Sequence, residues 1–146
     1  MKLSLLLPLL FTVALTACIK QSEGSKIDCD IHAGYCSKII AEDNINVIFD
    51  CNPKPVKSMS ELLFSVSLKE KDKPITDARV EIDLTMPGMF MGDNRILLVH
   101  KENGRYEGKG VIVRCPSGKR IWKADVIIER PLKKTVRTSY VFEVKN

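Results

Sequence analysis

The sequence predicts an all-β protein, an immunoglobulin-like antiparallel β-sandwich of about seven strands. Three observations support this fold class. From residue 45 onward, apolar and polar residues alternate with a period of two, which is typical of half-buried strands. Turn-forming residues interrupt this alternation about every 8 to 14 residues, the spacing expected of a sandwich. Asn103-Gly104, between two alternating segments, is the strongest short hairpin signal in the chain.

Seven segments carry the alternating pattern. In one of them, Leu62, Phe64, Val66 and Leu68 would lie on the same face and point into the core. Proline, glycine, asparagine and aspartate occupy the positions between the segments, where turns need them. The predicted strands are 45–50, 61–68, 78–84, 95–100, 106–114, 120–129 and 136–144.

The N-terminus has the layout of a bacterial secretory signal. Lys2 precedes an apolar run, and small residues lead to Cys18. Residues 15–18, LTAC, resemble a lipobox, so we expect residues 1–17 to be removed and Cys18 to be acylated. Several acyl chains on one residue anchor a protein stably without spanning the membrane. Ile19, rather than aspartate, follows the cysteine, which favours the outer membrane over the inner membrane.

Residues 18–28 are polar and aperiodic, and they predict a flexible tether between the anchor and a folded domain. Residues 29–146 suit a single domain with one core. The formal net charge of +5 is too small to indicate a nucleic-acid-binding protein. Residues 105–146 are the basic part, with 11 Lys or Arg against 4 Asp or Glu. We therefore expect the membrane, through the lipid anchor, and an envelope protein as partners, and no nucleic acid.

Four cysteines follow Cys18, and an even number in an exported domain predicts disulfides. Four cysteines allow three pairings. Short separation favours Cys29–Cys36, which leaves Cys51–Cys115 to join distant strands. An alternative for the first loop is a metal site of Cys29, His32 and Cys36, although structural zinc prefers four ligands.

Sequence motifs give little support for an enzyme. The chain has no HExxH, GxSxG or glycine-rich phosphate loop. Its two histidines, His32 and His100, have no cysteine partner that is expected to be a free nucleophile. Paired acids such as Glu81 and Asp83 lie on the solvated face of a predicted strand. We expect a non-catalytic protein.

Residues 84–93, LTMPGMFMGD, concentrate three of the chain's five methionines: Met86, Met89 and Met91. One interpretation is packing, because methionine fills irregular gaps at the edge of a core. The other is a Cu(I) site, because thioethers are soft ligands that suit Cu(I). His100, which ends the next predicted strand, is a candidate fourth ligand. No cofactor other than copper is suggested.

The segment from residue 55 to 130 contains a set of residues in a recognisable order: Pro74, Asp77, Ala78, Val80, Met86, Pro87, Met89, Gly104, Tyr106 and Trp122. With these residues the segment resembles the YtkA-like and FixH-like group of bacterial extracytoplasmic domains. The resemblance implies an immunoglobulin-like sandwich at the membrane surface, and some of these relatives are associated with copper handling. At residues 114–118 the sequence departs from the pattern of the group.

Two classes of function follow from these observations. The first is a membrane-anchored periplasmic lipoprotein that acts as a non-catalytic binding or accessory module. The second is a periplasmic protein that holds Cu(I) through the methionine cluster.

Overall fold

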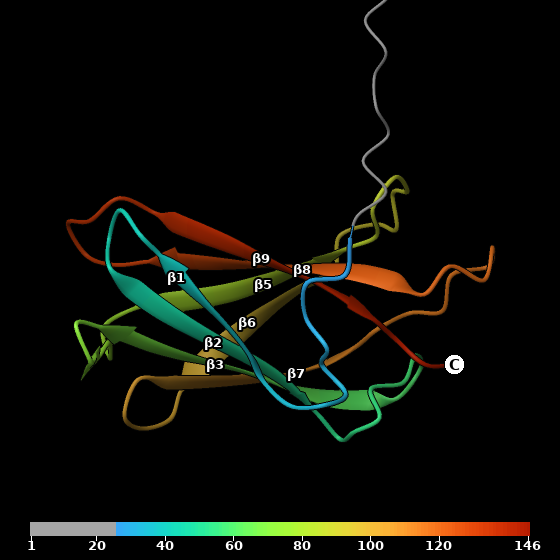
Figure 1. Ribbon diagram of the computed structural model, residues 1–146, viewed down its shortest axis with the longest axis horizontal. Helices are drawn as coiled ribbons and strands as arrows, with labels where there is room; N and C mark the ends of the chain where they lie inside the picture. Colours follow the sequence, from blue (N-terminus) through green and yellow to red (C-terminus); the bar gives the residue numbers. More distant parts are fainter. Residues whose placement is uncertain (1–25) are drawn as a thin grey trace, which may run out of the picture.

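The computed structural model describes residues 26–146, and Figure 1 shows them as an all-β domain. Cys18 and most of the predicted tether lie outside the described residues. None of the residues from 26 to 146 forms a helix long and apolar enough to cross a membrane. The nine strands are β1 (Cys36–Ile40), β2 (Ile45–Asn52), β3 (Glu61–Glu70), β4 (Lys73–Pro74), β5 (Arg79–Thr85), β6 (Arg95–His100), β7 (Arg105–Val111), β8 (Ile121–Glu129) and β9 (Val136–Glu143).

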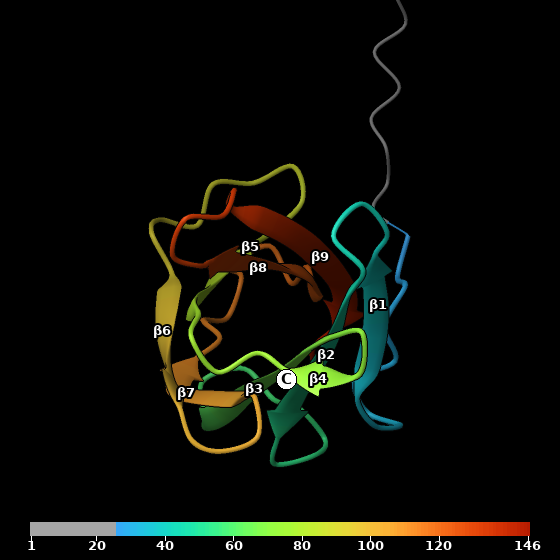
Figure 2. The same ribbon diagram turned by 90° about the vertical axis from the view of Figure 1, so that its left-hand side faces the viewer.

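The strands pair in the order β1-β2-β3-β7-β6-β5-β8-β9, with β4 added to β3, and every pairing is antiparallel. Figure 2 shows them curling into a nearly closed ring. The runs β2-β3-β7 and β5-β8-β9 correspond to the A-B-E and C-F-G strands of the two immunoglobulin sheets. The predicted fold class is therefore confirmed.

Strand β6 joins the two sheets. Its first part pairs with β5, whereas Val99 and His100 pair with β7. Two glycines of β7 make this crossing possible. A Cβ on Gly108 would lie 2.7 Å from the Leu98 side chain, and one on Gly110 would overlap the Ile96 side chain. Because Gly108 and Gly110 have no side chains, β6 can approach β7 closely at these positions, and the sheet can bend there.

Side chains from both sheets fill the interior. The predicted core face of β3 is buried, and so is the alternating face of β8 that carries Trp122. Phe49 on β2 packs against Tyr140 and Phe142 on β9, with ring centroids 5.1 and 5.8 Å away. The Tyr140 hydroxyl donates a hydrogen bond to the Val47 carbonyl at 2.7 Å. These contacts hold β2 of one sheet against β9 of the other.

The Asn103-Gly104 hairpin forms as predicted. Both residues have positive φ angles, 49° and 74°, and the Arg105 amide donates to the Glu102 carbonyl at 2.8 Å. This is the geometry of a tight type I′ turn, which matches the twist of the flanking strands.

The segment before β2 is tied down by a disulfide between Cys29 and Cys36, as predicted. This bond excludes the alternative metal site, because sulfurs joined to each other are not thiolate ligands. His32 also has another role. Its Nδ1 accepts from the Val56 amide at 3.2 Å, and its Nε2 donates to the Glu143 carbonyl at 3.0 Å. The imidazole braces the N-terminal segment against the end of β9.

The predicted Cys51–Cys115 disulfide is wrong, because both thiols are free and buried. Cys51 lies at the end of β2, opposite Phe64, and is enclosed by the core. Burial raises the pKa of the Cys51 thiol to about 12. Cys115 lies in the loop between β7 and β8, and its sulfur faces the methionine loop instead.

Candidate functional site

The loop between β5 and β6, residues 86–94, begins with a tight turn. The Met89 amide donates to the Met86 carbonyl at 3.1 Å, and the two residues form an isolated antiparallel bridge. Pro87 and Gly88 occupy the central positions of this turn, and Gly88 has a φ of 74°. Proline followed by a residue with positive φ is the signature of a type II turn. The sequence MPGM therefore fixes the start of the loop.

The three methionines point toward the core, and the phenylalanine among them does not. Met86 is 3% exposed, and Met89 and Met91 are partly buried against the core. Phe90 is 90% exposed. This is the alternation expected of an extended segment, with Met89 and Met91 on one side and Phe90 on the other.

Cys115 contributes a fourth sulfur, in contrast to its predicted disulfide with Cys51. Its Sγ–H donates to the Met89 Sδ at 3.6 Å, and its Sγ lies 3.0 Å from the Ser117 Oγ. The turn that follows is closed by the Gly118 amide, which donates to the Cys115 carbonyl at 3.0 Å. The hydrogen bond from Ser117 lowers the pKa of the Cys115 thiol from its ordinary value.

A hollow of about 310 Å³ lies beside the loop. Both apolar and charged side chains form its walls, and two polar atoms at the base of the loop are buried without a hydrogen-bond partner: Thr85 Oγ1 and Asn94 Nδ2. Arg95 pairs with Asp93 at 3.2 Å across the mouth. The lining residues are Asp83, Thr85, Met89, Phe90, Met91, Gly92, Asp93 and Arg95.

His100 is not part of this cluster, so the predicted fourth ligand is wrong. The methionine loop enters β6 at Arg95, whereas His100 ends the strand. Five residues at about 3.3 Å each separate the two ends by roughly 16 Å. Figure 1 shows the β5–β6 and β6–β7 loops at opposite ends of the domain. The His100 ring packs on Tyr106 instead, with centroids 5.0 Å apart.

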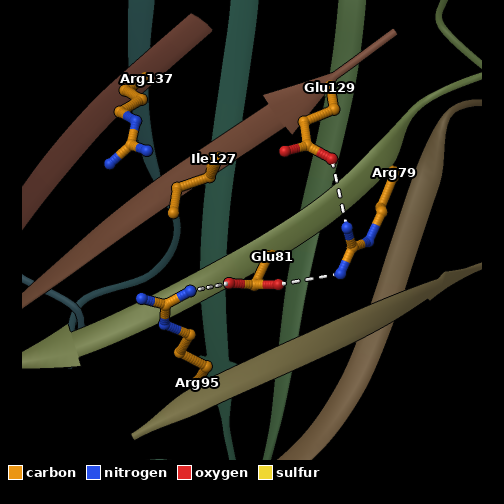
Figure 3. Close-up of a pocket in the computed structure, with 6 residues that line it drawn as sticks. All are labelled: Arg79, Glu81, Arg95, Ile127, Glu129 and Arg137. Atoms are coloured by element: carbon orange, nitrogen blue, oxygen red, sulfur yellow. Dashed lines mark hydrogen bonds and ion pairs between the residues drawn. The ribbon is translucent and has the colours of Figure 1, made fainter. Parts of the chain in front are cut away.

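A second hollow, of about 130 Å³, lies on the outer face of β5, β6, β8 and β9. Figure 3 shows a chain of ion pairs in it: Arg79 joins Glu129 at 3.3 Å and Glu81 at 3.4 Å, and Arg95 joins Glu81 at 3.4 Å. Arg137 lies apart from this chain, beyond Ile127. Exposed pairs of this kind contribute at most about 1 kcal/mol each. This face is a solvated strand surface.

Among residues 26–146, no group of three His, Cys, Asp or Glu side chains lies close enough together to hold a metal ion. A metal that prefers nitrogen or oxygen ligands therefore has no cluster in this part of the chain. The sulfur contact between Cys115 and Met89, with Met86 bridged to Met89, is of a different kind, because two of the three residues carry thioethers. The donor chemistry fits a soft monovalent ion such as Cu(I).

Fold and loop together define a small immunoglobulin-like sandwich with a sulfur-rich site at one end. The family model of YtkA-like proteins matches residues 41–114. The chain belongs to this family. Membership of this family indicates an accessory extracytoplasmic domain. The match includes the methionine loop and ends one residue before Cys115. No curated protein and no solved structure matches the chain.

Proposed function

We propose that the protein is a non-catalytic accessory module of the bacterial cell envelope, anchored by a lipid on Cys18 and facing the periplasm from the outer membrane. Its working surface is the β5–β6 loop, which binds a protein partner. The lipobox-like residues 15–18 support the anchor. Membership of the YtkA-like family supports the extracytoplasmic role.

The observation that carries the partner-binding proposal is the exposure of Phe90. A phenylalanine that is 90% exposed leaves nearly all of its ring in water, and phenylalanine is among the aromatic residues enriched at protein interfaces. The loop that presents it is held by the Met86–Met89 bridge and by the packing of Met89 and Met91. A fixed loop loses little conformational entropy on binding.

The charges around Phe90 indicate the chemistry of the partner. The hollow beside it is lined by two acidic side chains, Asp83 and the mostly exposed Asp93, and by one basic side chain, Arg95, which pairs with Asp93 at 3.2 Å. The acidic groups therefore exceed the basic ones by one. The partner surface that fits is an apolar pocket for the Phe90 ring, flanked by Lys or Arg. Such rim charges mainly increase the association rate and set the orientation.

Site-specific photo-crosslinking tests this proposal. A photoreactive residue at position 90 of the full chain, expressed in bacteria, is expected to give one discrete crosslinked product. Leu132 provides the matched control, because it is also an exposed apolar residue but lies in the β8–β9 loop at the other end of the domain. Absence of a product at position 90, or the same products at positions 90 and 132, would contradict the proposal.

A second candidate function is Cu(I) binding by the methionine loop. The specific observation in its favour is the bridge between Met86 and Met89, which directs two thioethers to the same side. Met91 follows on the same side of the segment as Met89. A protein that holds Cu(I) through these groups would serve copper handling in the envelope.

Replacing Met86, Met89 and Met91 together with leucine separates the two functions. Leucine keeps the volume and apolarity of methionine, so each change is expected to alter the free energy of unfolding by less than about 1.5 kcal/mol. Cu(I) binding, measured by competition with a chromogenic chelator under anaerobic conditions, is expected to be lost. Equal Cu(I) affinity of the triple variant and the natural protein would exclude the methionines as ligands.

A further inference from the structure

We propose that the Cys115 thiolate is the anchoring ligand of a Cu(I) site, in which the Met89 and Met86 thioethers are the neutral ligands. This inference rests on the second candidate function and changes its ligand set, because Cys115 replaces the predicted ligand His100. Cys115 lies just beyond the segment matched by the family.

The distance between the sulfurs fits a shared ion. The Cys115 Sγ and the Met89 Sδ are 3.6 Å apart. With metal–sulfur bonds of about 2.3 Å, sulfurs at this distance subtend roughly 100° at an ion between them. This value is close to the tetrahedral angle, so one ion can contact both sulfurs without a large movement of either side chain.

Met86 is the third ligand because of its pairing with Met89. Side chains directly opposite each other in an antiparallel pair point to the same face, with Cβ atoms about 4.5–5.5 Å apart. The bridge places Met86 and Met89 in this relation. The thioether of methionine has three rotatable bonds behind it, which lets it adjust to an ion.

The total charge of the ion and its ligands determines which ion the site favours. Cys115 is 3% exposed, and Met86 is equally buried, so the site does not tolerate an uncompensated charge. Cu(I) with one thiolate and two thioethers is neutral overall. A divalent ion with the same ligands would leave one positive charge in the core, and thioethers are poor ligands for hard cations. The ligand set therefore favours Cu(I) over Zn²⁺ and Mg²⁺.

Binding exchanges one proton for one ion. The S–H bond of Cys115 breaks, its proton leaves to solvent, and the sulfur lone pair binds Cu(I); no electron is transferred. The Ser117 hydroxyl, 3.0 Å from the Cys115 Sγ, is placed to donate a hydrogen bond to the thiolate. Such outer partners hold a ligand in position. Residues 116–120, which follow Cys115, are exposed, so the Cys115 sulfur lies close beneath the protein surface.

Cys51 provides a matched control inside the same chain. It is also a free buried cysteine, but it lies at the end of β2, enclosed by the core. Cys115→Ala and Cys51→Ala remove the same atoms from buried positions. Only the first variant removes the proposed ligand, so any general effect of losing a buried thiol appears in both.

The test measures anaerobic Cu(I) competition on the full chain in detergent, with the Cys29–Cys36 disulfide intact. We expect one Cu(I) per chain, and a thiolate-to-Cu(I) charge-transfer band in the ultraviolet. Cys115→Ala is expected to lower the affinity by more than about 100-fold, beyond what loss of an outer partner costs, and Ser117→Ala by about 10-fold. Cys51→Ala should bind as the natural protein does. Near-ultraviolet circular dichroism of Trp122 verifies that each variant is folded.

The outcomes separate the two proposals. If Cys115→Ala keeps the affinity and the natural protein has no thiolate band, the methionines bind Cu(I) without Cys115, and only this inference fails. If the natural protein binds no Cu(I), the inference and the second candidate function fail together. An equal loss in Cys51→Ala and Cys115→Ala would show that binding depends on core integrity and would also overturn the inference.

Discussion

Gly104→Ala is expected to lower the free energy of unfolding by about 3 kcal/mol, through strain and through loss of backbone hydrogen bonds. Gly104 has a φ of 74°, which an alanine adopts only at a cost. A Cβ at this position would also lie 2.6 Å from the Leu68 carbonyl oxygen. That oxygen accepts from the Ile75 amide at 3.0 Å, and the Leu68 amide donates to the Gly104 carbonyl at 2.9 Å. Relieving the overlap disturbs both bonds.

Gly88→Ala is the control for this prediction. Gly88 has the same φ of 74°, but a Cβ there would meet no atom within 4 Å. It therefore carries only the conformational cost, about 1 kcal/mol. Urea unfolding of both variants, with stability obtained by linear extrapolation, measures the difference. If both variants lost the same free energy of unfolding, the close approach of residue 104 to Leu68 would contribute nothing to the effect of Gly104→Ala.

The sequence predicted the strands well where one face is buried and the other is solvated. All seven predicted segments contain a strand, because the period of two records which residues face the core, although the segment 106–114 was predicted too long and β7 ends at Val111. β1 and β4 were missed for physical reasons. β1 is an edge strand whose Ile39 is exposed, so its pattern lacks a buried face. β4 has only two residues, and one of them, Pro74, is a residue type typical of turns.

The cysteines show what counting residues does not reveal. An even number predicts disulfides, and the short Cys29–Cys36 separation identified the one that forms. The remaining pair was assigned by elimination, which ignores where each sulfur points. Cys51 is enclosed by the core, and Cys115 faces Met89. Direction depends on packing between strands that are distant in sequence, and the local pattern does not contain it.

The methionine loop was evident from the sequence, but its partner was not. His100 was chosen because antiparallel pairing was expected to bring the end of the next strand back toward the loop, but the whole of β6 separates His100 from the loop. A rule of antiparallel meanders would have corrected this. Two antiparallel strands, β6 and β7, lie between the β5–β6 and β7–β8 connections, so the two connections lie at the same end of the domain, as Figure 1 shows. Cys115 is in the second of these connections.

Phe49→Ala is expected to have the largest effect on stability of any single change considered for this domain, a loss of about 3–5 kcal/mol. Phe49 is fully buried. Its ring packs against Tyr140, Phe142 and Phe64, at centroid distances of 5.1, 5.8 and 6.5 Å. Tyr140 and Phe142 belong to the facing sheet, so the variant leaves a cavity where the sheets meet. A loss of this size is a large part of the stability of a typical domain.

Phe90→Ala is the matched control, because it removes the same ring from a position that is 90% exposed. It should change the free energy of unfolding by less than about 0.5 kcal/mol, while removing the proposed partner contact. Urea unfolding followed by Trp122 fluorescence compares the two variants with the natural protein. The two variants therefore distinguish Phe49, which holds the sheets together, from Phe90, which is proposed to contact a partner. A loss below about 1 kcal/mol for Phe49→Ala, well under the range for buried phenylalanines, would contradict the aromatic packing between β2 and β9.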